Sequence, residues 1–465
     1  MTWTGKELLA LGFPSGPALG LALSLTGPAE EELGEAGVAR LLRELLADPA
    51  AHQDHPHFGP VARALVAELE RPRYTVRAEP APYRIWGEGL EEGPLEQMRN
   101  AVSLPVAVQG ALMPDAHQGY GLPIGGVLAT ENSVIPYGVG VDIACRMKLS
   151  VFDLPPIALQ DRNDRLVEIL LRETVFGAGA SRSRPAAHPV LDADWKVTPV
   201  TARVSDRARA QLGTSGSGNH FVEWGVLTLA EPELGLPAGE YLALLSHSGS
   251  RGAGALIANH YSRLAMDRHP ELPPALRRLA WLDLDTAEGQ EYWAAMNLMG
   301  EYAAANHAVI HRKIHRALGA ELLEGVENHH NFAWKERHGE RELIVHRKGA
   351  TPAGPGVLGV IPGSMASPGF VVRGRGREES LQSASHGAGR VMSRTAAKAK
   401  YEWSEITPLL RERSVQLLAA GIDENPFVYK DIHQVMAAQA DLVEIIARFD
   451  PRIVRMADAG EPPED

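Results

Sequence analysis

The stretch Gly-Val-Gly-Val-Asp-Ile-Ala-Cys, residues 138–145, contains the only cysteine of the 465-residue chain. Asp142 stands three residues before Cys145, so the two side chains share a face if the segment is helical. A thiolate beside a carboxylate is a typical pair of ligands for a divalent metal ion. A lone buried cysteine is otherwise a small apolar residue, and the rest of the sequence has to decide between these interpretations.

Three histidines further along the chain favour a metal site. His220 ends the run Gly-Ser-Gly-Asn-His, His247 lies in Ser-His-Ser-Gly-Ser-Arg-Gly, and His330 is followed by asparagine. Such small residues let the main chain approach a ligand closely. One thiolate, one carboxylate and three imidazoles suffice for two metal ions if the thiolate bridges them. We therefore predict a two-metal site made of Asp142, Cys145, His220, His247 and His330.

A further motif, Ser-His-Gly-Ala-Gly-Arg, leaves His386 uncrowded between small residues. Arg390 and Arg394 follow it at helical spacing. A histidine near a helix start, with arginines behind it, can attack a phosphorus atom and hold the resulting phosphoramidate. Arg251, in the His247 motif, has the planar fork that suits a bidentate phosphate contact.

Asp115 and His117 lie together in Met-Pro-Asp-Ala-His-Gln-Gly-Tyr-Gly. One interpretation is a buried turn that Asp115 caps. The other is a pair that supports metal ligands from behind or contacts a substrate phosphate. The sequence favours neither.

A second histidine set has the spacing of metal ligands. His307, His311 and His315 lie four residues apart in a predicted helix over residues 288–318. No carboxylate or thiolate accompanies them, and arginine and lysine neighbours surround them. We predict a basic, largely solvated helix face that binds no metal.

Composition indicates a soluble globular protein, with 45% hydrophobic and 22% charged residues. No apolar run is long enough for a membrane helix, the N-terminus lacks a signal-peptide layout, and a single cysteine fits a reducing compartment. We predict a cytoplasmic protein without a membrane partner. The formal net charge of -12 argues against a general nucleic-acid binder, but arginines crowd the second half, and a local basic cleft would suit a phosphate-bearing substrate.

The chain is predicted to be an α+β protein with three parts. Residues 1–80 have the pattern of a helical extension, with amphipathic helices over 38–46 and 61–69. From residue 83, short apolar runs alternate with Gly- and Pro-rich turns, which is typical of strands, for example over 125–129, 147–152 and 241–246. Further helices are predicted over 252–267, 384–403, 415–421 and 432–447. Residues 81–456 would form the catalytic domain and 457–465 an acidic tail.

The ordered motifs resemble the RtcB-type tRNA-splicing RNA ligases. The resemblance rests on the runs quoted above and on Val-His-Arg-Lys-Gly-Ala-Thr from Val345, Pro-Gly-Ser-Met from Pro362 and His-Gly-Ala-Gly-Arg-Val-Met-Ser-Arg from His386. It covers roughly residues 83–456. It implies an RtcB-like catalytic domain that joins RNA ends bearing a 2′,3′-cyclic phosphate or 3′-phosphate to 5′-hydroxyl ends, with an activating protein such as archease as a partner.

The resemblance also implies two Mn²⁺ ions and GTP. Cys145 would bridge the metals, His247 and His330 would complete one site, and Asp142 and His220 the other. His386 would attack the α-phosphorus of GTP and carry GMP. Arg251, Arg390 and Arg394 would contact RNA or phosphate. The implied nucleotide contacts are Asn219, Glu223, Asn331, Gly363, Ser364, Gly387, Ala388, Gly389, Tyr429 and Arg455.

Two departures from the family pattern concern the nucleotide. After Pro-Gly-Ser-Met the chain has Ala-Ser-Pro-Gly where the family often has Gly-Thr-Ala-Ser. Near the C-terminus, Arg455 is expected in place of a guanine-contacting lysine. Because arginine can pair with both guanine O6 and N7, we expect GTP to remain preferred.

Two other functions fit parts of the pattern. A dinuclear metal phosphodiesterase or cyclic-phosphate hydrolase would use the five predicted ligands without requiring His386. A non-catalytic RNA-end-binding protein would keep the pocket without turnover, although such a binder has no need of a thiolate among histidines.

Overall fold

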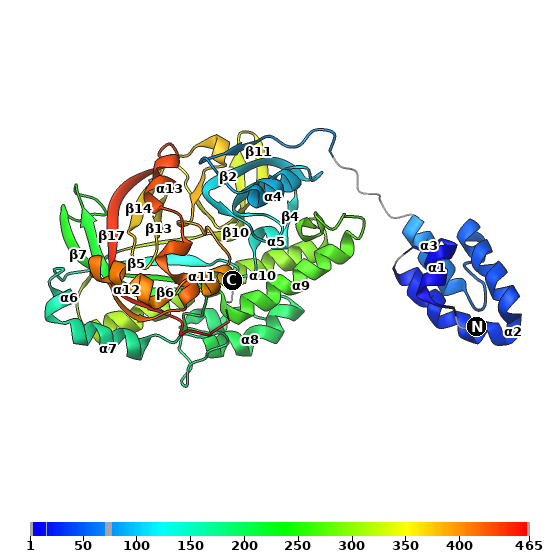
Figure 1. Cartoon of the computed structure of the whole chain (residues 1–465), viewed down its shortest axis with the longest axis horizontal. Coiled ribbons are helices and arrows are strands. Elements are labelled where there is room, and N and C mark those ends of the chain that lie inside the picture. The colour runs from blue at the N-terminus through cyan, green and yellow to red at the C-terminus, as the bar shows by residue number, and fades with distance from the viewer. Residues whose placement is uncertain (1–2, 15, 70–76, 463–465) are drawn as a thin grey trace. The chain divides into compact units, whose positions relative to one another are not determined.

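A computed structural model describes residues 3–14, 16–69 and 77–462 of the chain. The chain divides into two compact units, residues 1–75 and 76–465 (Figure 1). The division lies five residues before the boundary at residue 80 that composition suggested. Helices and strands are mixed throughout the larger unit, which confirms the α+β class.

The smaller unit is helical where it is described. It contains α1 (Gly5–Leu11), α2 (Pro17–Ala47), the 3₁₀ turn η1 (Ala50–His52) and α3 (Gly59–Leu69). Thr4 and Glu7 form a capping box that starts α1, and Gly12 ends it with a φ of 113°. Leu8, Leu42 and Phe58 are fully buried in a core of this unit's own.

The larger unit contains two main sheets. The five-stranded sheet has the order β1-β2-β3-β11-β10, and the eight-stranded sheet runs β13-β14-β17-β6-β7-β5-β9 with β16 paired to β17. Small two-stranded sheets join β12 to β15 and β4 to β8. The strands are β1 (Tyr83–Ile85), β2 (Ala107–His117), β3 (Ile124–Thr130), β4 (Ser133–Val134), β5 (Arg146–Phe152), β6 (Phe221–Leu229), β7 (Gly239–Ser248), β8 (Leu282–Asp283), β9 (Leu322–His329), β10 (Asn331–His338), β11 (Arg341–Lys348), β12 (Ala350–Pro352), β13 (Leu358–Ile361), β14 (Gly369–Gly374), β15 (Ser383–Ser385), β16 (Gln416–Ala419) and β17 (Val443–Met456).

Helices cover one face of the eight-stranded sheet, where Ile310 and Ile314 of the long helix α10 pack against Leu242 and Leu244 of β7 (Figure 1). The helices are α4 (Glu92–Val102), α5 (Pro136–Val139), α6 (Ala158–Asp161), α7 (Asn163–Glu173), α8 (Pro199–Gln211), α9 (Arg251–Arg268), α10 (Ala287–Leu318), α11 (Arg394–Lys400), α12 (Trp403–Glu412) and α13 (Ile432–Ala438), with short 3₁₀ turns η2 (Pro189–Asp192), η3 (Arg277–Leu279), η4 (Glu378–Ser380), η5 (Ile422–Glu424) and η6 (Pro426–Val428). No helix among the described residues is both long and apolar enough to cross a membrane.

Three helix predictions near the C-terminus need correction. Residues 415–421 contain the strand β16, which pairs in parallel with β17. The predicted helix over 384–403 is helical only in α11, because β15 and a glycine-rich loop come first. The segment over 432–447 ends its helix at Ala438 and then enters β17. Pairing with distant strands overrides local propensity here.

Strand register positions the functional motifs. In the eight-stranded sheet, β5 lies between β7 and β9, and Met147 of β5 is opposite both His247 and Asn328. Side chains alternate between sheet faces, and Met147, Leu245 and Val326 share one face. Cys145, His247 and His330 each lie an even number of residues from one of these three. Their side chains therefore point to the same face of the sheet, which is the face opposite α10.

Candidate metal centre and its pocket

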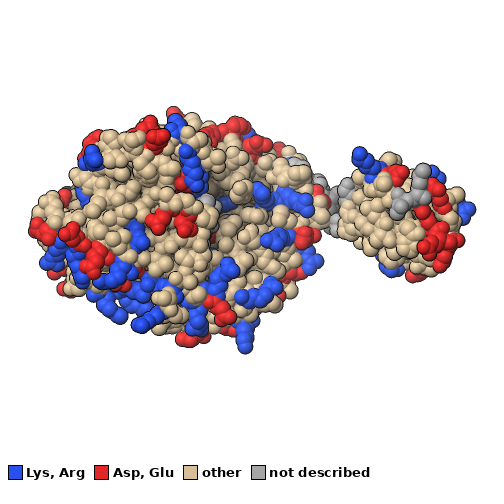
Figure 2. Space-filling view, turned by 60° about the horizontal axis from the view of Figure 1, so that its bottom comes forward, with Lys and Arg blue, Asp and Glu red and all other residues tan. Residues whose placement is uncertain are grey.

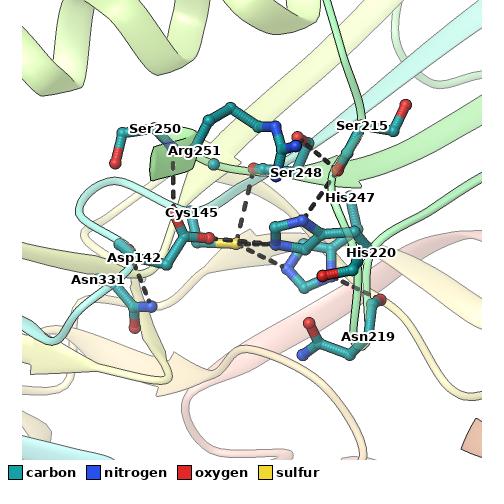
Figure 3. A network of polar contacts seen from close by, with 12 residues as sticks. Asp142, Cys145, Ser215, Asn219, His220, His247, Ser248, Ser250, Arg251 and Asn331 are labelled. Atoms are coloured by element: carbon teal, nitrogen blue, oxygen red, sulfur yellow. Dashed lines mark hydrogen bonds and ion pairs between the residues drawn. The ribbon is translucent and has the colours of Figure 1, made fainter. Parts of the chain in front are cut away.

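The five predicted metal ligands converge at one end of the eight-stranded sheet, and Figure 3 shows four of them, Asp142, Cys145, His220 and His247. Two groups of donor atoms form, and Cys145 belongs to both. The first group adds His247 and His330, and the second adds Asp142 and His220, with all atoms of a group within 4.8 Å of one another. Cys145 Sγ lies 3.1 Å from His247 Nε2 and 3.5 Å from His220 Nε2. The cluster is buried and compatible with two cations that share the sulfur.

Hydrogen bonds behind the histidines set their tautomers. His220 Nδ1 donates to the Ser215 carbonyl at 2.9 Å, and His247 Nδ1 donates to the Asn219 carbonyl at 3.2 Å. A neutral ring that donates from Nδ1 presents a lone pair at Nε2. The Nε2 atom of His220 lies 3.1 Å from an oxygen of Asp142. Two acceptors at that distance need a cation or a proton between them, and so this donor set fits a metal ion.

Burial keeps His247 and His330 in the neutral form that binds metal ions. It lowers the pKa of His247 to about 3 and that of His330 well below its ordinary value. Burial opposes ionisation of Asp142, but its pKa is lowered because a proton or positive charge on the His220 side, where a metal ion would bind, stabilises the carboxylate. Neutral imidazoles and an ionised carboxylate are the states that bind metal ions.

The loop that carries the cysteine has an unusual backbone. Ala144 has a φ of 57°, and its N–H donates to the Asn331 carbonyl. On the other side, the loop after β7 closes over Asp142, where Ser250 N donates to Asp142 Oδ1 at 3.0 Å. A Cβ atom at Gly249 would lie 2.1 Å from that same oxygen. Only glycine fits there, which explains the small residues in this motif.

His386 lies beside the metal cluster and is oriented by a buried carboxylate. Its ring centre is 4.8 Å from that of His330. Asp115 Oδ2 accepts from His386 Nδ1 at 2.7 Å and from the backbone N–H groups of His386 and Gly387. Asp115 is fully buried. With its proton held on Nδ1, the ring has an unprotonated Nε2 available as a nucleophile.

This geometry refines the expectation for Asp115 and His117. The carboxylate of Asp115 supports His386 rather than a metal ligand. His117 Nδ1 donates to the Asp115 carbonyl, and burial lowers the pKa of His117 to about 4. His117 therefore stays neutral and lines the pocket.

The cluster and His386 open into one cavity of about 610 Å³. Most residues expected to contact a nucleotide line it, although they come from distant parts of the chain. These are Asn219, Glu223, Asn331, Gly363, Ser364, Gly387, Ala388, Gly389 and Tyr429. Burial raises the pKa of the Glu223 carboxyl well above its ordinary value, so this group is suited to hydrogen bonding with a polar ligand edge.

Two of the predicted phosphate-binding arginines also line the cavity. Arg390 and Arg394 both pair with the buried carboxylate of Glu424. Arg394 also reaches Asp423 at 3.2 Å, and the Arg390 guanidinium lies 5.5 Å from the centre of the Tyr429 ring. Ion pairs with acidic side chains thus fix both guanidinium groups in the cavity wall, and the Tyr429 ring also contacts that of Arg390.

Arg251 and Arg455 lie elsewhere, which corrects two expectations. Arg251 is 2% exposed, and it donates to Thr214 Oγ1 and the Gly177 carbonyl, so it braces two loops. Arg455 donates to the Leu170 and Leu171 carbonyls at the end of α7. Neither occurs among the described residues that line the cavity. Val454 and Met456 of β17 face the cavity, and strand alternation turns Arg455 to the opposite face.

The histidines of α10 are also placed differently from the prediction. His307 and His311 are buried, at 0% and 4% exposure, and both contact Ser246 Oγ at 2.8 Å. The predicted solvated face is therefore wrong for these two. They belong to none of the metal-ligand groups in the described part of the chain. Because Ser246 is next to His247 but on the other sheet face, the pair packs behind the metal cluster.

Sequence reasoning missed Lys348 as a site residue. It is buried at the end of β11, lines the cavity, and donates from Nζ to the Tyr120 carbonyl. Burial, with help from the nearby Arg278, lowers the pKa of Lys348 to about 7. Its place in Val-His-Arg-Lys-Gly-Ala-Thr was the only signal in the sequence. A lysine in that run gives no sign of burial.

Known proteins are similar to this chain over most of its length. The family model described as tRNA-splicing ligase RtcB matches residues 97–457. The chain is 33% identical over 401 residues to an RNA-splicing ligase RtcB of Escherichia coli strain K12, covering 79% of this chain and 95% of that protein. It is 32% identical over 436 residues to a tRNA-splicing ligase RtcB of Nanoarchaeum equitans, covering 78% and 91%. An RNA-splicing ligase RtcB of Mycobacterium tuberculosis is 33% identical over 430 residues, covering 76% and 98%.

Proposed function

Since this chain belongs to the tRNA-splicing ligase RtcB family, we propose that it joins RNA ends bearing a 2′,3′-cyclic phosphate or 3′-phosphate to 5′-hydroxyl ends, using GTP and two Mn²⁺ ions. Membership of this family makes the protein an RNA ligase. The observation that carries the finer proposal is the position of His386, which Asp115 orients beside the five-residue donor set.

The first step is nucleotide transfer to His386. Nε2 attacks the α-phosphorus of GTP, an N–P bond forms, and the bond to the β-phosphate oxygen breaks with release of pyrophosphate. Asp115 holds the Nδ1 proton, so the ring becomes cationic without losing its orientation. Bound Mn²⁺ would neutralise phosphate charge and polarise the P–O bonds, with Cys145, Asp142, His220, His247 and His330 as its ligands.

The second and third steps transfer the nucleotide to RNA and then join the ends. An oxygen of the RNA 3′-phosphate attacks the phosphorus on His386, the N–P bond breaks, and the activated RNA end forms. The 5′-hydroxyl of the second strand then attacks the 3′-phosphate, and GMP leaves. Arg390 and Arg394 line the cavity, and phosphates of either strand would share these side chains with their partners Glu424 and Asp423.

Glu223 is the side chain best suited to recognise the base. It lies on β6 in the cavity wall with a buried carboxyl group. Because Arg455 turns away from the cavity, guanine recognition is assigned to Glu223 rather than to an arginine fork. Competition among GTP, ATP and deoxy-GTP for covalent labelling measures this preference, and equal labelling by ATP would contradict it.

An RNA partner is compatible with the charge distribution. The net charge is -12, yet Lys and Arg side chains gather along the lower left of the larger unit in Figure 2, with acidic side chains between them. Such a surface can attract a polyanion locally although the whole chain is acidic.

A ligation assay tests the proposal. A 3′-phosphate strand and a labelled 5′-hydroxyl strand are incubated with the protein, GTP and Mn²⁺, and the products are separated on a denaturing gel. We expect a joined product that requires both GTP and Mn²⁺. On a strand that ends in a 2′,3′-cyclic phosphate, opening of the ring without joining, and without a need for GTP, would instead support the phosphodiesterase or cyclic-phosphate hydrolase alternative. RNA binding without any conversion would support the non-catalytic one.

Metal analysis tests the donor set separately. The purified protein should hold two Mn²⁺ ions per chain, and Cys145→Ala should lose both because the thiolate belongs to both donor groups. A variant that keeps two tightly bound ions would exclude the bridging role.

A further inference from the structure

The cavity extends past the proposed metal and nucleotide contacts to an exposed aromatic side chain. Tyr120 is 60% exposed and lines the cavity together with Tyr137 and Lys348. The Arg278 guanidinium lies 4.4 Å from the centre of the Tyr120 ring and 5.9 Å from that of Tyr137. One wall of the cavity thus presents Tyr120, Tyr137 and Lys348, with the Arg278 guanidinium over the Tyr120 ring, and the steps above give Tyr120, Tyr137 and Arg278 no role.

The turn that carries Tyr120 is fixed although the ring is exposed. Gln97 holds Gly119 with both ends of its amide, since Nε2 donates to the Gly119 carbonyl at 2.7 Å and Oε1 accepts from its N–H at 3.0 Å. Lys348 Nζ donates to the Tyr120 carbonyl. Gly121 has a φ of 72°, and a Cβ atom there would lie 2.7 Å from the Arg278 carbonyl oxygen. A side chain on such a backbone is pre-organised for binding.

The Tyr120 wall comes from a different sheet than Glu223, the proposed base contact, and is close to the reacting groups. Glu223 lies on β6 of the eight-stranded sheet, whereas Tyr120 follows β2 and Lys348 ends β11, both in the five-stranded sheet. Asn331 connects this wall to the metal cluster, because its Nδ2 donates to the Asp142 carbonyl at 3.2 Å. The side chains of Lys348 and Asn331 both approach Gly140. A ligand on Tyr120 would therefore lie on the side of the cavity that the proposed nucleotide leaves open.

We propose that the exposed face of the Tyr120 ring, opposite the face that Arg278 covers, is a stacking platform for the base of a terminal RNA nucleotide at the joined ends. This proposal rests on the proposed ligase function. Every nucleobase has a π-face, so stacking on tyrosine holds a strand end without reading its sequence. Arg278 supplies a further planar cation that can stack or pair with phosphate. The ring positions the strand, and the chemistry stays with His386 and the metal ligands.

The test couples a protein change to a substrate change. Ligation is measured for the parent, Tyr120→Ala and Tyr120→Phe with strands whose terminal nucleotide carries a base or is abasic, at the 3′-phosphate end or at the 5′-hydroxyl end. With strands whose ends carry a base, we expect Tyr120→Ala to raise the KM for RNA about tenfold. Tyr120→Phe keeps an aromatic face and should have the KM of the parent. At the stacked end, the abasic strand should be used equally by parent and Tyr120→Ala. Tyr241→Ala, a tyrosine on β7 outside the cavity lining, is the matched control.

The outcomes separate this proposal from the proposed function. If the parent ligates but Tyr120→Ala behaves like the control, or loses activity equally on normal and abasic strands at both ends, the platform is excluded and the ligase function stands. If the parent neither ligates nor forms a GMP adduct, the proposed function fails. Fluorescence anisotropy with a labelled 5′-hydroxyl strand and a labelled 3′-phosphate strand then tests the platform alone, because equal affinity of parent and Tyr120→Ala for both strands would exclude it.

Discussion

At the scale of single residues, the structure explains why one histidine among many can be a nucleophile. His386 shares a hydrogen bond with a fully buried carboxylate, whereas His220 and His247 donate from Nδ1 to backbone carbonyls. A carboxylate stabilises the cationic ring that forms during attack, and a carbonyl does so less. His220 and His247 thus differ from His386 in the group that accepts the Nδ1 hydrogen bond.

The Asp115–His386 pair leads to a first prediction. Asp115→Asn should reduce the rate of GMP labelling roughly 10- to 100-fold, because an amide can hold either ring tautomer and carries no charge. Metal content should stay at the parent level. Single-turnover labelling measures the rate, and Asp441→Asn, which changes a carboxylate bonded to Trp86, is the control. Unchanged labelling by Asp115→Asn would show that the carboxylate does not orient His386.

Lys348 leads to a second prediction, which concerns pH. Its pKa is lowered from 10.5 to about 7 in the folded protein. Below about pH 7, Lys348 is protonated in both the folded and the unfolded protein, so folding bears the full free-energy cost of burying its charge. Above about pH 7 the unfolded chain binds more protons than the folded one, so stability rises with pH. Relative to Lys348→Met, the parent should gain about 1.4 kcal/mol of unfolding free energy per pH unit from about pH 7 to 9.

Denaturant unfolding without added metal or nucleotide measures this gain. Lys335→Met, which removes an exposed lysine on β10, should show no such pH-dependent difference from the parent. A constant difference between the parent and Lys348→Met across the range would contradict the lowered pKa.

At the scale of elements, the sequence predicted which motifs come together but not toward which face of a sheet each side chain points. The small residues around Cys145, His220 and His247 were enough to group them, because such motifs are rare outside close-packed sites. The direction of the Arg455 side chain depends on the alternation of side chains along β17. The burial of His307 and His311 depends on the packing of α10 against β7. Lys348 was missed because burial of a lysine follows from the fold rather than from its neighbours in sequence. Neither sheet register nor helix docking can be read from a motif.

The α10 histidines lead to a third prediction. The double change His307→Ala and His311→Ala should destabilise the protein by about 2 kcal/mol or more, because it opens a cavity and removes the partners of the buried Ser246 hydroxyl. Metal content should remain at the parent level. His315→Ala, a partly buried position near the end of the same helix, should cost less. Loss of a metal ion in the double variant would show that these rings take part in the cluster.

At the scale of the whole molecule, the chain combines two units with separate cores. The family model begins at residue 97, beyond the smaller unit. All described residues that line the site cavity belong to the larger unit. We therefore expect residues 76–465 to be sufficient for the chemistry.

This separation leads to a fourth prediction. A protein of residues 76–465 should fold, bind two Mn²⁺ ions and ligate RNA with a kcat close to that of the full chain. Calorimetry of the full chain should show an unfolding transition that the shorter protein lacks, since the smaller unit has its own core. An insoluble or inactive shorter protein would contradict the independence of the larger unit.

The central claim is that His386 carries the nucleotide, and covalent labelling tests it most directly. The protein is incubated with α-labelled GTP and Mn²⁺, denatured, and treated with acid or base. The parent should carry labelled GMP in a bond that acid cleaves and base does not, as a phosphoramidate behaves, and His386→Ala should carry none while it still binds Mn²⁺. An unlabelled parent, or a variant that still becomes labelled, would contradict the account.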